Sequence, residues 1–243
     1  MSVWGTSFLL SISNFMKSRK VNATYFGAYL LALSNVGFSQ GFQNLNFESA
    51  KLSGYSPGSQ NVPTSAALPG WSAYFTTSTL TNQLAQNWYD DISLGGVAIS
   101  VNDTNTGFGF VPIQGRYSAY LFGGSGNGSA VISQTGLVPS GAKSLLMDVN
   151  QYFGFIVTLG GQTINMVPLQ VFSNYTLYGG DVSSFSSQLS LLSITAPPTG
   201  VPNPVLLDNI QFSAESIPEP TGRALFTFGA LLLSFFRRQN SRS

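Results

Sequence analysis

The chain has 243 residues, of which only 8% are charged and 13% are aromatic, and it contains 26 glycines. It has no cysteine, which excludes disulfides, thiolate catalysis and Cys-ligated metals, and no histidine, which removes the commonest general base and zinc ligand. Low charge combined with many aromatic and small polar residues is typical of extracellular β-proteins rather than of disordered chains.

Basic residues are concentrated at the two ends of the chain. Between residues 40 and 217 there are three basic residues against eight acidic ones, so this central part carries a net charge of about −5. A negatively charged domain of this kind lacks the excess of basic residues that binds DNA or RNA. We therefore expect no nucleic-acid partner.

The first 39 residues have the pattern of a secretory signal. A basic n-region follows Met16, an apolar run covers residues 23–36, and small residues precede a cleavage site between Ser39 and Gln40. The pattern predicts a signal-peptide helix within residues 1–39 that is removed by signal peptidase. The residues before Met16 are interpreted as an upstream mis-assigned start, with a long n-region as the alternative.

From Gln40 onward the pattern has period two, and Gly, Pro and Asn separate the apolar runs. This pattern predicts one all-β domain over residues 40–216, a β-sandwich, with a barrel as the other architecture compatible with so many short strands. The predicted strands are 42–48, 71–76, 97–101, 117–122, 130–134, 144–149, 155–159, 162–167, 174–178, 189–196 and 205–212.

Three local signals refine this prediction. The dipeptides Asn127-Gly128 and Gly160-Gly161 each separate two apolar runs, and because these residues tolerate positive φ, each dipeptide predicts a tight β-hairpin. Asp181 precedes a Ser-rich stretch and is expected to cap one or two helical turns within residues 181–188.

The best candidate for ligand binding is the run Trp88-Tyr89-Asp90-Asp91, an aromatic pair followed by two carboxylates. Sugars dock on aromatic faces, and exposed rings often mark a binding site. The two aspartates are a poor glycosidase pair, since adjacent residues of a strand point to opposite faces and cannot easily flank one glycosidic bond. Trp71 is expected to lie in the core.

Five short motifs occur along the predicted domain. They are Phe47-Glu48, Leu68-Pro69-Gly70-Trp71, Gly115-Arg116-Tyr117-Ser118, Ile132-Ser133-Gln134-Thr135 and Leu207-Asp208-Asn209-Ile210. Together they resemble the jelly-roll domains of the galactose-binding-like class, which is common among bacterial surface proteins and carbohydrate-binding modules. The resemblance implies a jelly-roll sandwich. In that class a Glu on the first strand and an Asp on the last strand often meet at a structural calcium, and Glu48 and Asp208 match those places. The alternative is that both carboxylates are bonded to backbone amides. No other cofactor is expected.

The C-terminal residues 217–243 consist of three blocks. Pro218-Glu219-Pro220 comes first, an apolar run over residues 224–236 follows, and Arg237 and Arg238 come directly behind it. As a helix the apolar run would span about 20 Å, which is short of the roughly 30 Å hydrocarbon core of a bilayer. The arginine pair favours the cytoplasmic side of the membrane.

This order of blocks resembles the PEP-CTERM sorting signal of exported bacterial proteins. The resemblance implies that a membrane enzyme called exosortase processes Pro218-Glu219-Pro220, while the apolar helix holds the chain in the inner membrane transiently. It also implies export to the cell surface or the extracellular matrix. The alternative is a plain hydrophobic anchor with an accidental Pro-Glu-Pro tripeptide.

The sequence therefore predicts a non-enzymatic surface or matrix protein, structural or associated with exopolysaccharide. A carbohydrate-binding module is the alternative from a second functional class. An enzyme that works only with carboxylates is the lesser alternative, because the chain contains no histidine or cysteine.

Overall fold

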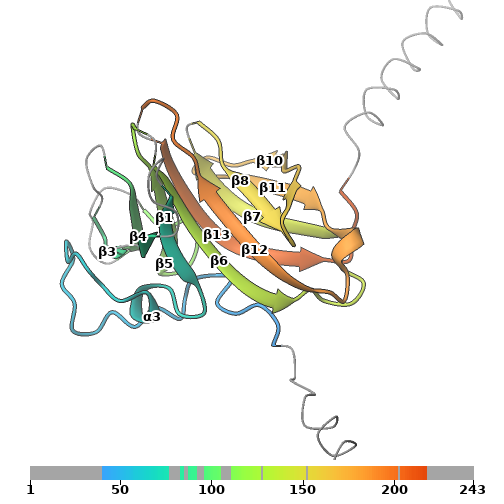
Figure 1. Cartoon of the computed structure of the whole chain (residues 1–243), viewed down its shortest axis with the longest axis horizontal. Coiled ribbons are helices and arrows are strands. Elements are labelled where there is room, and N and C mark those ends of the chain that lie inside the picture. The colour runs from blue at the N-terminus through green and yellow to red at the C-terminus, as the bar shows by residue number, and fades with distance from the viewer. Residues whose placement is uncertain are drawn as a thin grey trace, which may run out of the picture. The chain divides into compact units, whose positions relative to one another are not determined.

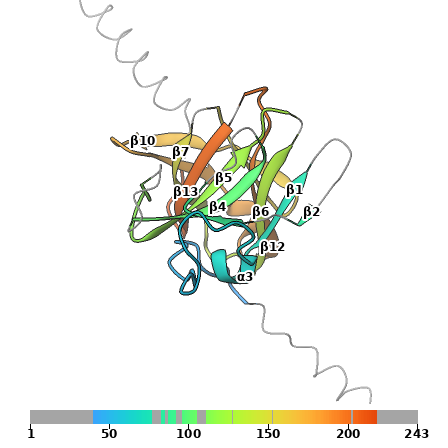
Figure 2. The same cartoon turned by 90° about the vertical axis from the view of Figure 1, so that its left-hand side faces the viewer.

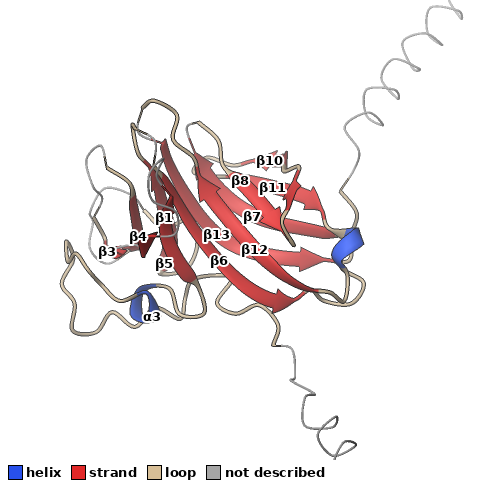
Figure 3. Ribbon diagram, viewed as in Figure 1, coloured by secondary structure: helices blue, strands red, loops and turns tan. Residues whose placement is uncertain are grey.

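The computed structural model describes residues 40–76, 83–84, 87–91, 96–104, 111–126, 128–151, 153–201 and 203–217. These residues form two β-sheets and two short helical segments, α3 (Thr64–Ala67) and the 3-10 turn η1 (Ser183–Phe185) (Figure 3). The predicted two-sheet β-sandwich is therefore confirmed. The predicted terminal helices lie outside the described residues.

Each sheet is almost entirely antiparallel, and only β3 and β4 pair in parallel (Figure 1). The six-stranded sheet has the order β2 (Gln83–Leu84), β1 (Ser72–Thr76), β6 (Ser129–Leu137), β12 (Leu189–Ala196), β8 (Ile156–Leu159) and β9 (Gln162–Ile164). The seven-stranded sheet has the order β10 (Val167–Val171), β11 (Thr176–Asp181), β7 (Ser144–Gln151), β13 (Asn203–Ser213), β5 (Tyr117–Gly123), β4 (Ala98–Asp103) and β3 (Asn87–Tyr89).

The core lies between the two sheets, which Figure 2 shows from the side of β3 and β4. Because successive residues of a strand point to opposite faces, every second residue of the six-stranded sheet turns inward. One inward row crosses five strands in register and consists of Ala73, Ile132, Ile194, Val157 and Ile164. These five side chains belong to the main hydrophobic cluster, so the period-two pattern of the sequence builds the core directly.

Every predicted run except 42–48 contains a strand. Residues 42–48 form turns instead, because Asn44 and Phe47 have positive φ angles of 47° and 57°, which no regular strand allows. The side chain of Asn44 supports this turn, since its Oδ1 accepts a hydrogen bond from Ser49 N at 3.0 Å. The expectation of a first strand over residues 42–48 is therefore wrong.

Three strands were not predicted: β2, β3 and β10. β2 and β3 have only two and three residues, which is too short for a periodic pattern. The predicted run 162–167 covers β9 and only the first residue of β10. The structure separates these two strands at residues 165–166, because they belong to different sheets. β10 contains Pro168, and it tolerates this residue because it is an edge strand.

The two hairpin predictions have different outcomes. Gly160 and Gly161 join β8 to β9 with φ angles of 57° and 79°, so this hairpin is confirmed. The hairpin at residues 127–128 is wrong, because β5 and β6 belong to different sheets and the chain crosses the sandwich there. A side chain at Gly123 would overlap the backbone carbonyl of Pro197 at this crossing.

The predicted helical turn is present as η1. Asp181 Oδ1 accepts a hydrogen bond from Ser183 N at 2.8 Å, and this bond lowers the pKa of the Asp181 carboxyl. The expected cap at Asp181 is wrong, because the N-cap position of η1 is Val182 and Asp181 is the last residue of β11, from which it bonds two residues ahead.

Candidate functional site

The run Trp88-Tyr89-Asp90-Asp91 lies at the end of β3, and its side chains have different environments. Tyr89 is 5% exposed and Asp90 only 1%, so neither can belong to an exposed platform. Asp90 has a positive φ of 51° and accepts a hydrogen bond from Asp103 N at 3.3 Å. Asp91 is half-buried. Trp88 is half-buried and packs on a second cluster formed by Ala98, Ile113, Tyr120, Phe122 and Leu206.

Asp103 is the centre of a polar network that joins β3, β4 and β5. Its buried carboxylate accepts a hydrogen bond from the Tyr89 hydroxyl at 2.8 Å and forms an ion pair with Arg116 at 3.0 Å. The Arg116 guanidinium lies 4.8 Å from the ring centroid of Tyr117. Burial, together with the contact to Asp103, raises the pKa of Tyr89 to about 12. This network fixes the ends of three strands.

Glu48 organises the segment that precedes β5. Its Oε1 accepts hydrogen bonds from the backbone N–H groups of Arg116 at 2.8 Å and of Tyr117 at 3.0 Å. A Cβ atom at Gly115 would overlap this carboxylate, and Gly115 also has a φ of 59°. The close approach of Glu48 to the backbone therefore requires glycine at position 115.

Asp208 holds the same segment from the side of β13. It is 1% exposed, and its Oδ2 accepts hydrogen bonds from Gln114 N at 3.0 Å and Ser118 Oγ at 2.7 Å. Its Oδ1 accepts from Asn209 N at 2.7 Å. Burial raises the pKa of Asp208 to about 6, although these hydrogen bonds act in the opposite direction. Asp148 accepts from the Gln114 and Asn209 side chains, and burial raises its pKa too.

The structure thus brings Glu48 and Asp208 to one segment, and the negative charge of Glu48 contributes to the raised pKa of Asp208. Calcium needs six to eight oxygen ligands. Both oxygens of Asp208 already accept hydrogen bonds, and the described residues contain no group of three or more Asp, Glu, His or Cys placed for a metal. Among the described residues, both carboxylates accept hydrogen bonds from backbone amides, as the alternative interpretation expects.

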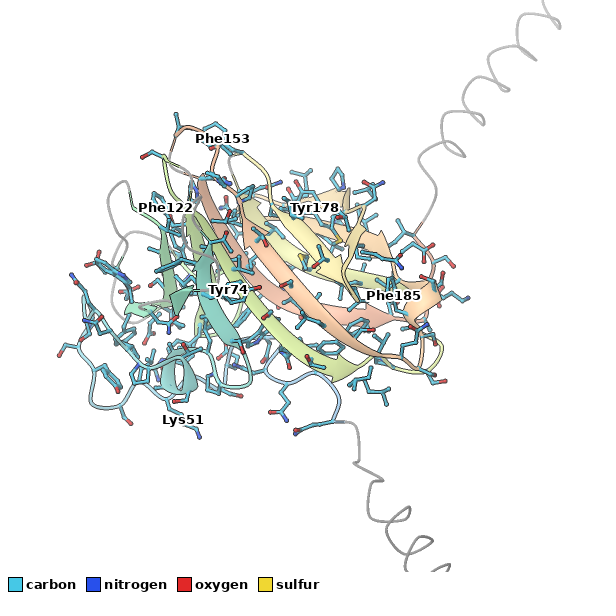
Figure 4. The ribbon with its side chains drawn as sticks, viewed as in Figure 1. Lys51, Tyr74, Phe122, Phe153, Tyr178 and Phe185 are labelled. Carbon is cyan, nitrogen blue, oxygen red and sulfur yellow. The ribbon has the colours of Figure 1, made fainter. Side chains whose placement is uncertain are left out.

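A cleft opens at the other end of the sandwich, where β8 and β9 lie near β7 and β11. Its volume is about 350 Å³. The rings of Phe155 and Tyr178 meet edge to face in its wall, with centroids 5.1 Å apart (Tyr178 is labelled in Figure 4). The lining residues are Gln151, Gly154, Phe155, Ile156, Thr163, Ile164, Asn165, Met166 and Tyr178.

Gln151 is the most informative residue of this cleft. Its Nε2 donates a hydrogen bond to the Tyr178 hydroxyl at 2.8 Å. Its Oε1 is buried and accepts no hydrogen bond from any residue that the structure describes. A buried acceptor without a donor costs about 1–3 kcal/mol, so this oxygen is an unsatisfied polar position in the wall of the cleft. The cleft therefore combines aromatic faces with an unused polar atom.

A second cavity of about 460 Å³ lies beside the first and shares Thr163, Ile164 and Asn165 with it. Lys143 and Asp181 also line this cavity. So do Ser216 and Ile217, the last described residues before the predicted sorting motif.

The cleft was missed by sequence reasoning. Gln151 and Gly154 follow the predicted strand 144–149, and Tyr178 ends another run, so no local motif connects them. The only available signal was that Phe155 and Tyr178 stand at the ends of predicted strands, where loops and clefts occur.

The residues predicted for cleavage and sorting are Ser39, Pro218, Glu219, Pro220, Arg237 and Arg238, and all of them lie outside the described residues. Gln40, on the other side of the predicted cleavage site, is described and exposed. Within the described part of the chain, no helix has the length and apolar character needed to cross a bilayer.

No protein-family model and no curated protein matches the chain. Among solved structures, the chain is similar to the carbohydrate-binding module TmCBM61 in complex with β-1,4-galactotriose, with 12% identity, a TM-score of 0.41, and coverage of 73% of this chain and 100% of that one. It is also similar to a family 11 carbohydrate-binding module from Clostridium thermocellum in complex with a β-1,3-1,4-mixed-linked tetrasaccharide. That match has 9% identity, a TM-score of 0.32, and coverage of 67% and 99%.

Proposed function

We propose that this chain is an exported, non-catalytic β-sandwich protein that binds a glycan in the cleft between β8, β9 and β11. The observation that carries the proposal is the Gln151 amide, which is fixed by Tyr178 and leaves Oε1 without a donor among the described residues. Sugar hydroxyls are donors, and the apolar faces of sugar rings pack on aromatic side chains. Thr163 and Asn165 add further hydrogen-bonding groups to the same wall.

Binding is favoured over cleavage by the composition of the two cavities. Among the described residues, those that line the first cavity include no Asp or Glu, and those that line the second include one carboxylate, Asp181. Glycoside hydrolysis normally requires two carboxyl groups that flank the scissile bond. The composition therefore supports a binding protein of a surface or exopolysaccharide layer.

Replacing Tyr178 with alanine should weaken glycan binding about tenfold or more, because the variant loses an aromatic wall and releases Gln151 from its fixed orientation. Gln151→Ala should have a similar effect. Isothermal titration against a panel of neutral oligosaccharides measures both variants, with Tyr55→Ala, an exposed residue outside the cleft, as the control. Wild-type affinity in both cleft variants would refute the assignment of the site.

The C-terminal blocks support a proposal for the destination of the protein. Pro218-Glu219-Pro220 acts as a PEP-CTERM processing site for exosortase, and the apolar run 224–236 acts as a temporary anchor in the inner membrane. Signal peptidase removes residues 1–39 during export. The jelly-roll body is then released to the cell surface or the matrix, where it meets exopolysaccharide.

Replacing Pro218-Glu219-Pro220 with three alanines should leave the protein in the membrane fraction of a host that has exosortase. The reason is that the apolar run stays attached to the body when the processing site is absent. Cell fractionation and the intact mass of the released protein provide the measurement. A surface protein that keeps Phe236 and its arginines would show that the segment is a permanent anchor.

Calcium at Glu48 and Asp208 remains a separate proposal. Its support is that both carboxylates approach the segment before β5 and that burial, together with the charge of Glu48, raises the pKa of Asp208. Residues Glu48 and Asp208 would each supply carboxylate oxygens to the ion, which would neutralise this charge.

A further inference from the structure

The outer face of the six-stranded sheet carries a row of hydroxyl side chains. The strand register places Ser72 of β1 opposite Ser133 of β6, Ser133 opposite Ser193 of β12, Ser193 opposite Thr158 of β8, and Thr158 opposite Thr163 of β9. All five belong to the alternate set that points away from the core, because their neighbours in sequence form the inward row. Residues 72, 133, 193, 158 and 163, called the hydroxyl row below, thus cross five strands.

The hydroxyl row is a regular array. Neighbouring strands lie roughly 4.8 Å apart, so five strands give a row of roughly 19 Å. Ser133 and Ser193 are 6% and 8% exposed and lie deep in the row, whereas Ser72 and Thr163 at its ends are exposed. The Tyr74 hydroxyl is 3.5 Å from Ser193 Oγ, so this tyrosine borders the row (Figure 4). The row therefore has exposed hydroxyls at its ends and an aromatic residue at its border.

The same sheet contains no charged residue in any of its six strands as the structure defines them. The strands of the seven-stranded sheet contain four aspartates. Solvent-facing protein surfaces usually carry about 25–35% charged residues. Apolar side chains also stand on this face, with Leu189, Leu191 and Ile156 63%, 45% and 41% exposed. These strands lie side by side in Figure 1.

We infer that the hydroxyl row binds a neutral polysaccharide chain that lies across the strands. A polyhydroxylated neutral polymer matches this face in charge, because neither partner has to desolvate an ion. The accessible hydroxyls of Ser72, Thr158 and Thr163 bond to the chain, and exposed leucines and Tyr74 pack on the apolar faces of its sugars. Thr163 also lines the cleft, so the row continues into the proposed glycan site, and the inference extends that proposed function to long chains.

The test uses the full chain purified in detergent and two probes, a soluble neutral trisaccharide and an insoluble neutral β-glucan. The row variant is Ser72→Val/Thr158→Val, which removes two hydroxyls but leaves the cleft and the buried serines intact. The matched control is Thr135→Val, because Thr135 is exposed on β6 one position outside the row, opposite Leu191.

The row variant should bind the polymer about tenfold more weakly, the loss expected for two hydrogen bonds, and should bind the trisaccharide as the wild type does. The control should bind both probes normally. Equal polymer binding by the row variant and the wild type would overturn the inference, as would a wild-type chain that binds no neutral polymer. If only the trisaccharide fails to bind, the cleft proposal fails and the row stands. If sedimentation shows that the wild type is a dimer and the row variant a monomer, the face binds a second copy of the chain instead.

Discussion

Replacing Phe47 with alanine should lower the free energy of unfolding of the fragment 40–217 by about 3–5 kcal/mol, the range for truncation of a buried aromatic residue. Phe47 is 0% exposed, and its ring centroid lies 5.7 Å from that of Trp71. Trp71 in turn donates its indole N–H to Asn44 O at 3.0 Å. The loss would therefore leave a cavity beneath the segment that replaces the expected first strand. Urea unfolding monitored by tryptophan fluorescence measures the effect.

The control is Tyr55→Ala, since Tyr55 is 36% exposed and its truncation should change the free energy of unfolding by only about 0.5 kcal/mol. Phe47 has a positive φ of 57°, which both phenylalanine and alanine find unfavourable, so the substitution leaves backbone strain unchanged. A loss below about 1 kcal/mol for Phe47→Ala would show that this segment does not pack as described.

Phe47 also illustrates what the sequence could and could not predict about the fold. Alternation of apolar and polar residues predicted most strands, because the inward row from Ala73 to Ile164 follows the period of two. Phe47 lies in an apolar run of similar appearance, yet a positive φ at Asn44 turns the chain there. The apolar side chain of Phe47 indicates that the residue is buried. The backbone angles that place it in the core depend on hydrogen bonds such as those from Ser49 N and from the Trp71 indole to Asn44.

Sheet membership was harder to predict than strand position. The sequence between β5 and β6 contains a dipeptide that favours a tight turn, but the two strands join different sheets. Their pairing partners, such as β13 and β12, follow much later in the chain. Short connections do not reveal such crossings. The Gly160-Gly161 hairpin is local and could be predicted, because two glycines tolerate the positive φ angles that its turn adopts.

The candidate site was less predictable than the fold. Trp88 and Tyr89 stand out in sequence, but Tyr89 is buried because Asp103 and Arg116, which lie further along the chain, complete a network around it. Gln151 and Tyr178 have no sequence signature, and they become a site only because β7 and β11 are neighbours. In physical terms, a site built from long-range pairings has no local pattern.

Lowering the pH from 7 to 4 should stabilise the fragment by about 2 kcal/mol in the presence of a chelator, because the folded state raises the pKa of Asp208 from 3.8 to about 6. The folded state binds this proton more tightly than the unfolded chain does. The stabilising contribution is therefore complete below pH 3.8 and is lost as the pH rises through about 6. The raised pKa of Asp148 acts in the same direction. Urea unfolding at half-unit pH steps measures the slope.

Asp208→Asn should remove most of this slope, since the amide does not titrate, although it also replaces an acceptor with a donor near Asn209 N or Gln114 N. Unfolding free energies that stay constant or increase from pH 4 to 7 in the wild type would contradict a desolvated Asp208.

Calcium provides the second comparison. If the ion binds Glu48 and Asp208, a hundredfold excess over Kd should stabilise the wild type by about 2.7 kcal/mol at pH 7. Glu48→Ala should then abolish this gain while it keeps the acid stabilisation, and an equal calcium gain in Glu48→Ala would place the ion elsewhere.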